Sequence, residues 1–334
     1  MNKSKIDWCD YTWNPVTGCF HGCEYCYARK IDKRFGDGNF TPTFHPERLQ
    51  EPLKVKKPSK IFVGSVSDLF GDWFWQVSKE PGTVTSYNMG MVVGKILDVV
   101  KQCPQHTFIF LTKNPKGMQG FNFPSNCLCG TSVEDQEKAN ERIPELLKVD
   151  CKTLWASYEP SLGKVDFGPW IRKYYHGGIP GLKRGEKLLP PSITGKPTLL
   201  QYAQEIAPDG PQRADKVYFT TDKHMANIFS LGYPMGDVYR AIPESPVEND
   251  PDCNEPEMSF QSPSGKIVSD KTPLLKWIVI GAQTGPGAVK PKSGWINSAA
   301  EQVKAANVPV FIKDNAADYY WGELLPREFP GVMG

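Results

Sequence analysis

The 334-residue sequence lacks any apolar run long enough to cross a membrane, and its mean hydropathy is −0.43. A membrane span needs about 18 or more apolar residues in succession, so we expect no membrane partner. The opening Met-Asn-Lys-Ser-Lys is not followed by the apolar core of a secretory signal. The nine cysteines are unevenly spaced and do not resemble a secreted disulfide framework. The sequence therefore predicts a protein of the reducing cytoplasm.

An excess of charge of one sign is also missing. Lys and Arg number 39 against 37 Asp and Glu, which gives a formal net charge of +2. This balance excludes a broad electrostatic surface for nucleic acid but not a local basic groove. With 40% hydrophobic residues and a length above that of a usual single domain, we expect one large domain with an insert.

Short β-branched or aromatic runs alternate with amphipathic stretches, which is the pattern of βα units around a parallel sheet. Strands are expected at 60–66, 107–113, 127–133, 152–160, 276–282 and 308–314, and helices at 87–103, 134–149 and 299–306. We therefore expect an α/β fold built as a partial or closed parallel (β/α) barrel.

Residues 174–272 interrupt this alternation with turn-rich segments and two strand-like runs, KVYFTT and GDVYRAIP. The stretch is too long for a connecting loop. We expect a mainly β inserted domain at 173–274, with the first part of the barrel at 1–172 and its last part at 275–334.

Three cysteines, Cys19, Cys23 and Cys26, stand close together in TWNPVTGCFHGCEYCYARK. Three soft ligands on one loop suit an iron–sulfur cluster or zinc. Structural zinc needs a fourth ligand, which His21 would supply, and unligated core cysteines are a third interpretation. A four-iron cluster held by three thiolates keeps one iron open to a substrate or cofactor.

Polar residues follow several of the expected strands, at the end where parallel βα folds build their sites. They are Ser65, Ser67, Asp68, Thr112, Lys113, Ser132, Glu134, Glu159, Gln283 and Thr284. We expect them to share one cavity. A lysine such as Lys113 facing a cavity needs an anion, which a ligand carboxylate or phosphate would provide. Ser132 suits either the cavity or the N-cap of the following helix.

The C-x3-C-x2-C spacing, with Tyr25 before the last cysteine, resembles the signature of the radical S-adenosylmethionine (SAM) superfamily. A closer resemblance, to phage and bacterial three-cysteine radical SAM-like proteins without a settled substrate, covers most of the chain outside the insert. It is carried by KIDWCDYTWNPVTGC, KIFVGSVSDLF, CPQHTFIFLTKNP, TSVEDQEKANERIP, EPSLGKVDF and WIVIGAQTGPGA. Gln283 and Cys9 depart from the residues that this family tends to have there.

This resemblance implies a [4Fe-4S] cluster on the three cysteines, SAM chelated at the open iron, and an electron donor. The 5′-deoxyadenosyl radical formed from SAM would abstract hydrogen from an organic substrate. Tyr25 would contact the cofactor, and Ser65, Ser67 and Asp68 would hold the methionine amino group. Ser132, Glu134 and Glu159 would line the ribose or substrate region, with Lys113 and Glu159 as catalytic residues.

The insert resembles the small ADP-ribosyltransferases of the rifamycin-modifying type, through YYHGGIPGLKRGEKLLPPS, KVYFTTDKHMANIF, GDVYRAIPESPVENDPDC and SFQSPSGKIV. This resemblance implies NAD binding. His176 with Gly177 would grip the nicotinamide ribose, Tyr218 would stack on the nicotinamide, and Asp250 would orient the ribose or acceptor.

Three functions follow from these patterns. The leading hypothesis is a radical SAM enzyme that acts on an organic substrate. A nucleobase or nucleotide is one candidate for that substrate. The first alternative is an NAD-dependent ADP-ribosyltransferase in the insert, with the barrel as scaffold. The second is a zinc-stabilised nucleic-acid-binding protein without catalysis.

Overall fold

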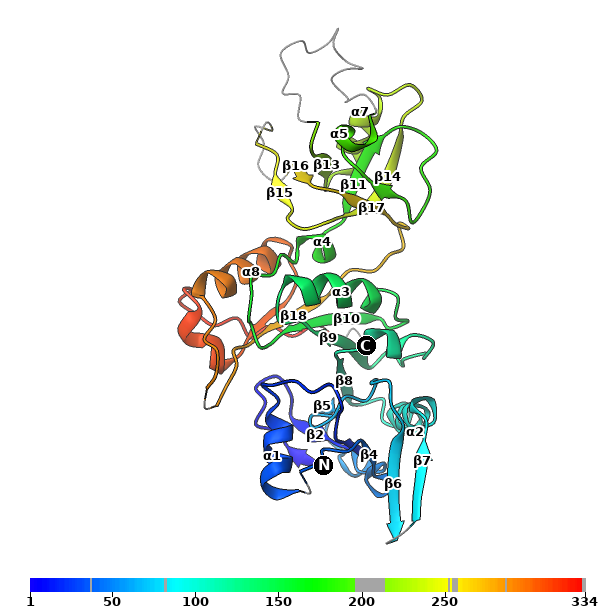
Figure 1. The fold of residues 1–334 in the computed structure, drawn as a ribbon, viewed down its shortest axis with the longest axis vertical. Helices are drawn as coiled ribbons and strands as arrows, with labels where there is room; N and C mark the ends of the chain where they lie inside the picture. Colours follow the sequence, from blue (N-terminus) through cyan, green and yellow to red (C-terminus); the bar gives the residue numbers. More distant parts are fainter. Residues whose placement is uncertain are drawn as a thin grey trace. The chain divides into compact units, whose positions relative to one another are not determined.

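The computed structural model describes residues 1–36, 38–80, 83–195, 214–251, 253, 258–285 and 287–331, with the backbone alone at 76–80 and 83–85. The chain divides into two compact units (Figure 1). Unit 1 comprises Met1–Val165 and Leu275–Gly334, and unit 2 comprises Asp166–Leu274. Within the described residues, no helix is both long and apolar enough to span a bilayer.

Unit 1 is built on an eight-stranded sheet. Its order is β1 (Asn2–Lys3), β2 (Tyr11–Trp13), β5 (Lys60–Val63), β8 (Thr107–Thr112), β9 (Cys127–Ser132), β10 (Thr153–Tyr158), β18 (Trp277–Ile280) and β19 (Val310–Ile312). β1 pairs antiparallel with β2, and every other neighbouring pair is parallel. The six strands expected from the sequence are confirmed, while the barrel of radical SAM type stays a prediction.

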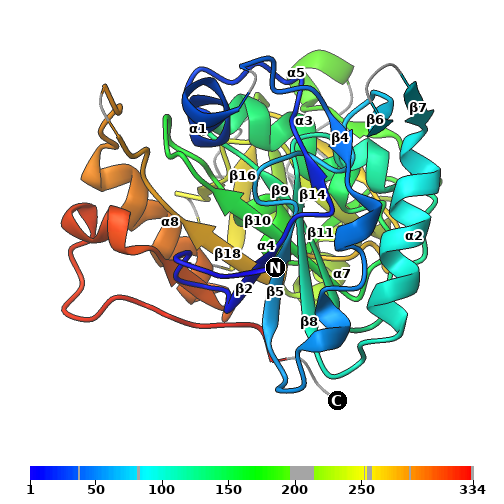
Figure 2. The same cartoon turned by 90° about the horizontal axis from the view of Figure 1, so that it is seen from below.

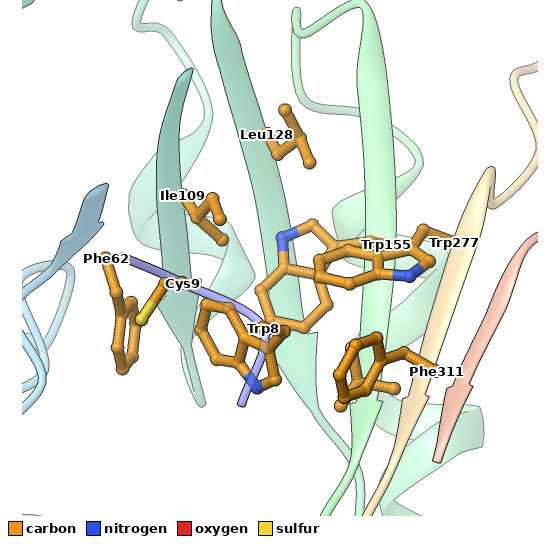
Figure 3. Close-up of a cluster of buried hydrophobic side chains, with 9 residues drawn as sticks. Trp8, Cys9, Phe62, Ile109, Leu128, Trp155, Trp277 and Phe311 are labelled. Atoms are coloured by element: carbon orange, nitrogen blue, oxygen red, sulfur yellow. The ribbon is translucent and has the colours of Figure 1, made fainter. Parts of the chain in front are cut away.

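The parallel sheet curves around Trp8, whose ring lies in a buried apolar cluster (Figure 3). The ring centroid of Trp8 is 4.8 Å from that of Phe62 on β5 and 6.0 Å from that of Trp277 on β18. Four strand spacings separate β5 from β18, which is roughly 19 Å in a flat sheet. One ring can contact both strands only because the sheet wraps around it.

Two helices of unit 1 begin at an asparagine or aspartate cap. Asn88 caps α2 (Met89–Lys101) by accepting from the Met91 backbone N–H at 2.9 Å. Asp135 caps α3 (Gln136–Leu146) in the same way, so the interpretation of Ser132 as the cap of this helix is wrong. α8 (Ser293–Ala305) begins six residues before the expected helix, and Figure 2 shows α2 and α8 flanking the parallel strands.

The sequence did not indicate a second sheet in unit 1. It joins β3 (Val16–Thr17), β4 (Thr43–Phe44), β6 (Trp75–Glu80) and β7 (Thr83–Tyr87). Short 3-10 helices lie at η1 (Pro46–Arg48), η2 (Pro52–Lys54), η3 (Pro115–Met118) and η4 (Asp314–Tyr319). β3 and β4 have two residues each and carry too little periodicity to be recognised in a sequence.

Unit 2 is mainly an antiparallel sheet. Its order is β12 (Lys187–Leu188), β17 (Gly265–Ile267), β14 (Asp237–Pro243), β11 (Tyr174–Gly178), β13 (Val217–Thr220), β16 (Ser259–Ser262) and β15 (Glu248–Asn249). Its helices are α4 (Gly168–Ile171), α5 (Pro191–Thr194) and α7 (Lys223–Ser230). The unit begins at Asp166, whose carboxylate accepts from the Val247 backbone N–H at 3.0 Å.

Candidate functional site

A cavity of about 650 Å3 opens in unit 1 at the carboxyl ends of the parallel strands. The three cysteines and Tyr25 line it, together with nine of the ten expected strand-end residues. Those nine are Ser65, Ser67, Asp68, Thr112, Lys113, Ser132, Glu159, Gln283 and Thr284. The strand-end pattern therefore predicted a shared cavity correctly.

The loop that carries the cysteines is fixed at its start by Gly18. Its φ is +82°, and a β-carbon there would lie 2.1 Å from the carbonyl oxygen of Thr41, so only glycine fits. The Gly18 N–H donates to the Val66 carbonyl at 3.1 Å. At the other end, the Cys26 sulfur caps α1 (Tyr27–Phe35) by accepting from the Arg29 backbone N–H at 3.4 Å. Close packing and a helix cap thus position the first and third cysteines.

The three thiols are soft donors of the kind that an iron–sulfur cluster needs, and all three line the same cavity. In the described part of the chain, no three His, Cys, Asp or Glu side chains are grouped so that they could hold a metal ion. A single zinc ion needs its ligands close together, because thiolates bind zinc at about 2.3 Å. A four-iron cluster is a wider cage, so its ligands stand farther apart. Burial, with the nearby Asp68, raises the pKa of the Cys19 thiol to about 12, so ligation would have to deprotonate it.

His21, the alternative fourth zinc ligand, is hydrogen-bonded to Asp68. The distance from its Nε2 to Asp68 Oδ2 is 2.8 Å, and its ring packs against Trp73 at 5.1 Å between centroids. Asp68 is buried and also accepts from the Thr112 hydroxyl at 2.6 Å and from the Lys113 backbone N–H at 2.8 Å. Asp68 therefore anchors the cysteine loop to β8.

The pKa of Asp68 reflects these bonds. Burial by itself would raise the pKa, but the His21 ring and the bonds from Thr112 and Lys113 hold it below its ordinary value. The carboxylate is thus ionised and its oxygens are occupied by the protein. Ser65 and Ser67 are then better placed than Asp68 to meet a ligand in this part of the cavity.

A second anchor joins the loop to β9 and α3 through a buried carboxylate, Glu134. Lys113 Nζ forms an ion pair with Glu134 and donates to the Tyr25 hydroxyl at 2.7 Å, and the Tyr25 hydroxyl donates to Glu134. Arg142 on α3 pairs with the same carboxylate at 3.0 Å. Burial would raise the pKa of Glu134, but Lys113 and Arg142 bring it below its ordinary value.

This network changes two expectations. The anion expected for Lys113 is Glu134, a residue of the chain itself rather than a ligand group. Glu134 pairs with Lys113 and Arg142 and does not appear among the residues that line the cavity, so its expected place in the ribose region is not supported. Burial, followed by the nearby Glu134, raises the pKa of Tyr25, so its hydroxyl keeps its proton.

Glu159 lies in the part of the cavity formed by the last strands of the sheet. Its carboxylate accepts from Lys313 Nζ at 2.6 Å and from Asn315 Nδ2 at 3.3 Å. A β-carbon at Gly281 would lie 2.8 Å from the Glu159 carboxyl carbon, so this glycine leaves space for the side chain. Glu159, Lys313 and Asn315 together offer both donors and acceptors to a polar ligand.

Sequence reasoning missed Lys313, Asn315 and Arg142. A signal existed for Lys313, because it follows the strand VPVFI as Lys113 follows TFIFLT. Arg142 gave no comparable signal, since an arginine in the middle of an amphipathic helix is ordinarily exposed.

In unit 2, the register places His176 and Tyr218 on opposite faces of the sheet. Tyr175 pairs with Thr220 across β11 and β13, so these two residues share a face. Side chains alternate along a strand, so Tyr218 shares that face and His176 lies on the other. The His176 ring contacts the backbone carbonyl of Tyr218, at 2.9 Å from Nδ1.

The other two expected NAD-binding residues have contacts of their own in the fold. A β-carbon at Gly177 would lie 2.1 Å from the Ala226 carbonyl oxygen of α7, so helix packing explains the glycine. The Asp250 carboxylate accepts from the Ser259 hydroxyl at 2.9 Å. Together with the opposite faces of His176 and Tyr218, this geometry does not support the NAD site.

A profile of the family described as "Protein of unknown function (DUF5131)" matches residues 3–328. Among curated proteins, "Uncharacterized protein MJ0683" of Methanocaldococcus jannaschii is 35% identical over 72 residues. The similar stretch is 21% of this chain and 28% of the relative, so the chain matches less than a third of that relative's length.

Proposed function

Because the chain belongs to the DUF5131 family, whose function is unknown, we propose its activity from the cavity: it is a radical SAM enzyme that abstracts hydrogen from an organic substrate. Unit 1 is proposed as a partial barrel of the radical SAM type. A nucleobase or nucleotide is the substrate class that we favour.

One observation carries this proposal. Three thiols from a single loop and a set of polar strand-end side chains line the same cavity. Thiols used only for packing do not need to face a cavity, and a buried free cysteine usually acts as a small apolar side chain. Cys19, Cys23 and Cys26 are instead partly exposed in the cavity wall.

The residues of the chain have separable tasks in this proposal. Cys19, Cys23 and Cys26 would hold a [4Fe-4S] cluster, which when bound supplies the electron for reductive cleavage of SAM. Ser65 and Ser67 line the cavity beside the loop; their hydroxyls donate to Asn14 Oδ1 at 3.1 Å and to the Gly64 carbonyl at 3.5 Å, and would accept from the amino group of the methionine moiety. Glu159 and Lys313 offer an acceptor and a donor for hydroxyl or amino groups of the ribose or substrate.

The cavity size is compatible with this assignment. Small-molecule sites commonly measure about 300–1,000 Å3, and the cavity here is about 650 Å3. Trp8 and Phe62 form part of its wall and exclude water from that side. A reactive radical needs such an enclosed environment, because side reactions would otherwise consume it.

The test is reductive cleavage of SAM. The anaerobically reconstituted protein with dithionite should form 5′-deoxyadenosine, and the triple variant Cys19→Ala, Cys23→Ala, Cys26→Ala should form none. The Cys151→Ala variant is the matched control, since Cys151 is partly buried and not among the cavity residues. Absence of 5′-deoxyadenosine from the wild-type protein would reject the proposal.

A further inference from the structure

α1 exposes an apolar stripe that follows directly on the cysteine loop. Ile31 and Phe35 lie four residues apart on one side of the helix and are 51% and 75% exposed. Tyr27, one turn before Ile31, is 52% exposed, but it also lines the cavity and donates its hydroxyl to the Ser65 carbonyl. Phe20, next to Cys19, adds another exposed aromatic side chain. Isolated apolar residues are common on surfaces, but a row along one helix marks an interaction site.

The same helix concentrates positive charge in a chain of nearly balanced composition. Lys30, Lys33 and Arg34 are all exposed. Asp32 is the only acid of the helix, and its carboxylate is engaged by the Phe40 backbone N–H at 2.9 Å. The exposed side of α1 therefore presents three cations on one flank of the apolar stripe, which complements an acidic partner with a neighbouring apolar contact area.

α1 lies next to the cysteine loop, and this position indicates what a bound partner would exchange with the group on the three thiols. The helix begins directly after Cys26, whose sulfur caps it, and both views show the helix at the periphery of unit 1 (Figures 1 and 2). A protein bound to the exposed stripe would stand beside the three thiols. Its redox centre would then be near the group that those thiols hold.

We propose that the exposed side of α1 is the docking surface for an acidic one-electron carrier protein. This inference rests on the proposed function, which needs one electron for each cleavage of SAM. The carrier would be oxidised by one electron and the cluster on Cys19, Cys23 and Cys26 reduced by one, with no proton or atom transferred. The basic residues would steer the carrier and the apolar stripe would form the centre of the contact.

The experiment uses a flavodoxin of negative net charge as the probe. Its dissociation constant is measured against the full chain, anaerobically, at about 50 and about 300 mM NaCl. The charge variant is Lys30→Glu, Lys33→Glu, Arg34→Glu, and the apolar variant is Ile31→Ser, Phe35→Ser. The matched control, Lys54→Glu, Lys56→Glu, Lys57→Glu, makes the same charge change at exposed lysines before β5.

Each α1 variant should weaken flavodoxin binding at least tenfold, and the control should change it less than threefold. The 5′-deoxyadenosine yield driven by reduced flavodoxin should fall with binding, while the yield driven by dithionite should not change. Wild-type binding should weaken as salt increases.

Three results would overturn the docking proposal: no flavodoxin binding by the wild type, equal effects of the α1 and control variants, or α1-dependent binding of a single-stranded oligonucleotide without binding of flavodoxin. Absence of product with dithionite is a separate result. It would reject the radical SAM function, while the dissociation constants would still decide whether α1 is a docking surface.

Discussion

Lys113 and Glu134 form an ion pair that connects the ends of the adjacent strands β8 and β9, with Tyr25 of the cysteine loop bonded to both. The side chain of Glu134 is only 6% exposed and is shared with Arg142. Removing its charge would leave two cations without their partner in a mostly buried setting. The pair therefore links the stability of the sheet to the position of the loop.

The first prediction concerns this carboxylate. Glu134→Gln should lower the free energy of unfolding of unit 1 by about 3–5 kcal/mol, because a broken buried ion pair leaves uncompensated charge. Glu137→Gln, at an exposed acid in the first turn of α3, should change it by less than about 1 kcal/mol. Urea unfolding of both variants checks the prediction, and equal effects would contradict it.

The second prediction concerns the start of the cysteine loop. Gly18→Ala should displace the loop and abolish iron binding, since its β-carbon would meet the Thr41 carbonyl oxygen at 2.1 Å. Gly22→Ala has a similar positive φ, but its β-carbon would have no neighbour closer than 4.0 Å, so it should retain iron. Iron content after anaerobic reconstitution distinguishes the two, and normal loading of Gly18→Ala would refute this account of the loop.

The third prediction concerns Trp8, around which the sheet curves. Trp8→Ala should destabilise unit 1 by about 3–5 kcal/mol, because it leaves a void between β5 and β18. Trp321→Ala is the control, since Trp321 is 72% exposed and its loss should cost less than about 0.5 kcal/mol. Thermal unfolding measures both, and a small effect at Trp8 would show that the sheet does not depend on this ring.

The fourth prediction concerns pH and unit 2. Burial lowers the pKa of His176, with the Tyr218 carbonyl acting in the opposite direction. Below a pH of about 6.5 the unfolded chain therefore binds a proton that the folded chain does not, so stability falls as pH falls, by at most about 1.4 kcal/mol per pH unit from this group.

Amide hydrogen exchange in β13 of the full chain measures this dependence. His176→Asn should flatten the slope between pH 6.5 and the lower pKa of the folded state. His224→Asn, at an exposed histidine of α7, should retain the wild-type slope. An unchanged slope in His176→Asn would assign the pH dependence to other groups.

The sequence predicted those features of the fold that depend on local periodicity. β-branched and aromatic runs located six parallel strands, and the polar residues after them located the cavity. The parallel pairing of the strands and the place of the cavity both depend on the direction in which the strands run, and a βα alternation specifies that direction.

Side-chain partners could not be predicted in the same way. Glu134 follows a strand as Glu159 does, yet Glu134 pairs with Lys113 and Arg142, whereas Glu159 lines the cavity with Lys313. The difference arises from rotamers and tertiary packing. The faces of His176 and Tyr218 likewise depend on strand register, which no motif specifies.

The metal content of the anaerobically purified chain tests most directly the claim that the three thiols of the loop hold an iron–sulfur cluster. The account predicts about four irons and four sulfides per chain, all lost in the triple Cys→Ala variant and retained in Cys151→Ala. One zinc per chain without iron or sulfide, or no metal on any of the three thiols, would contradict it.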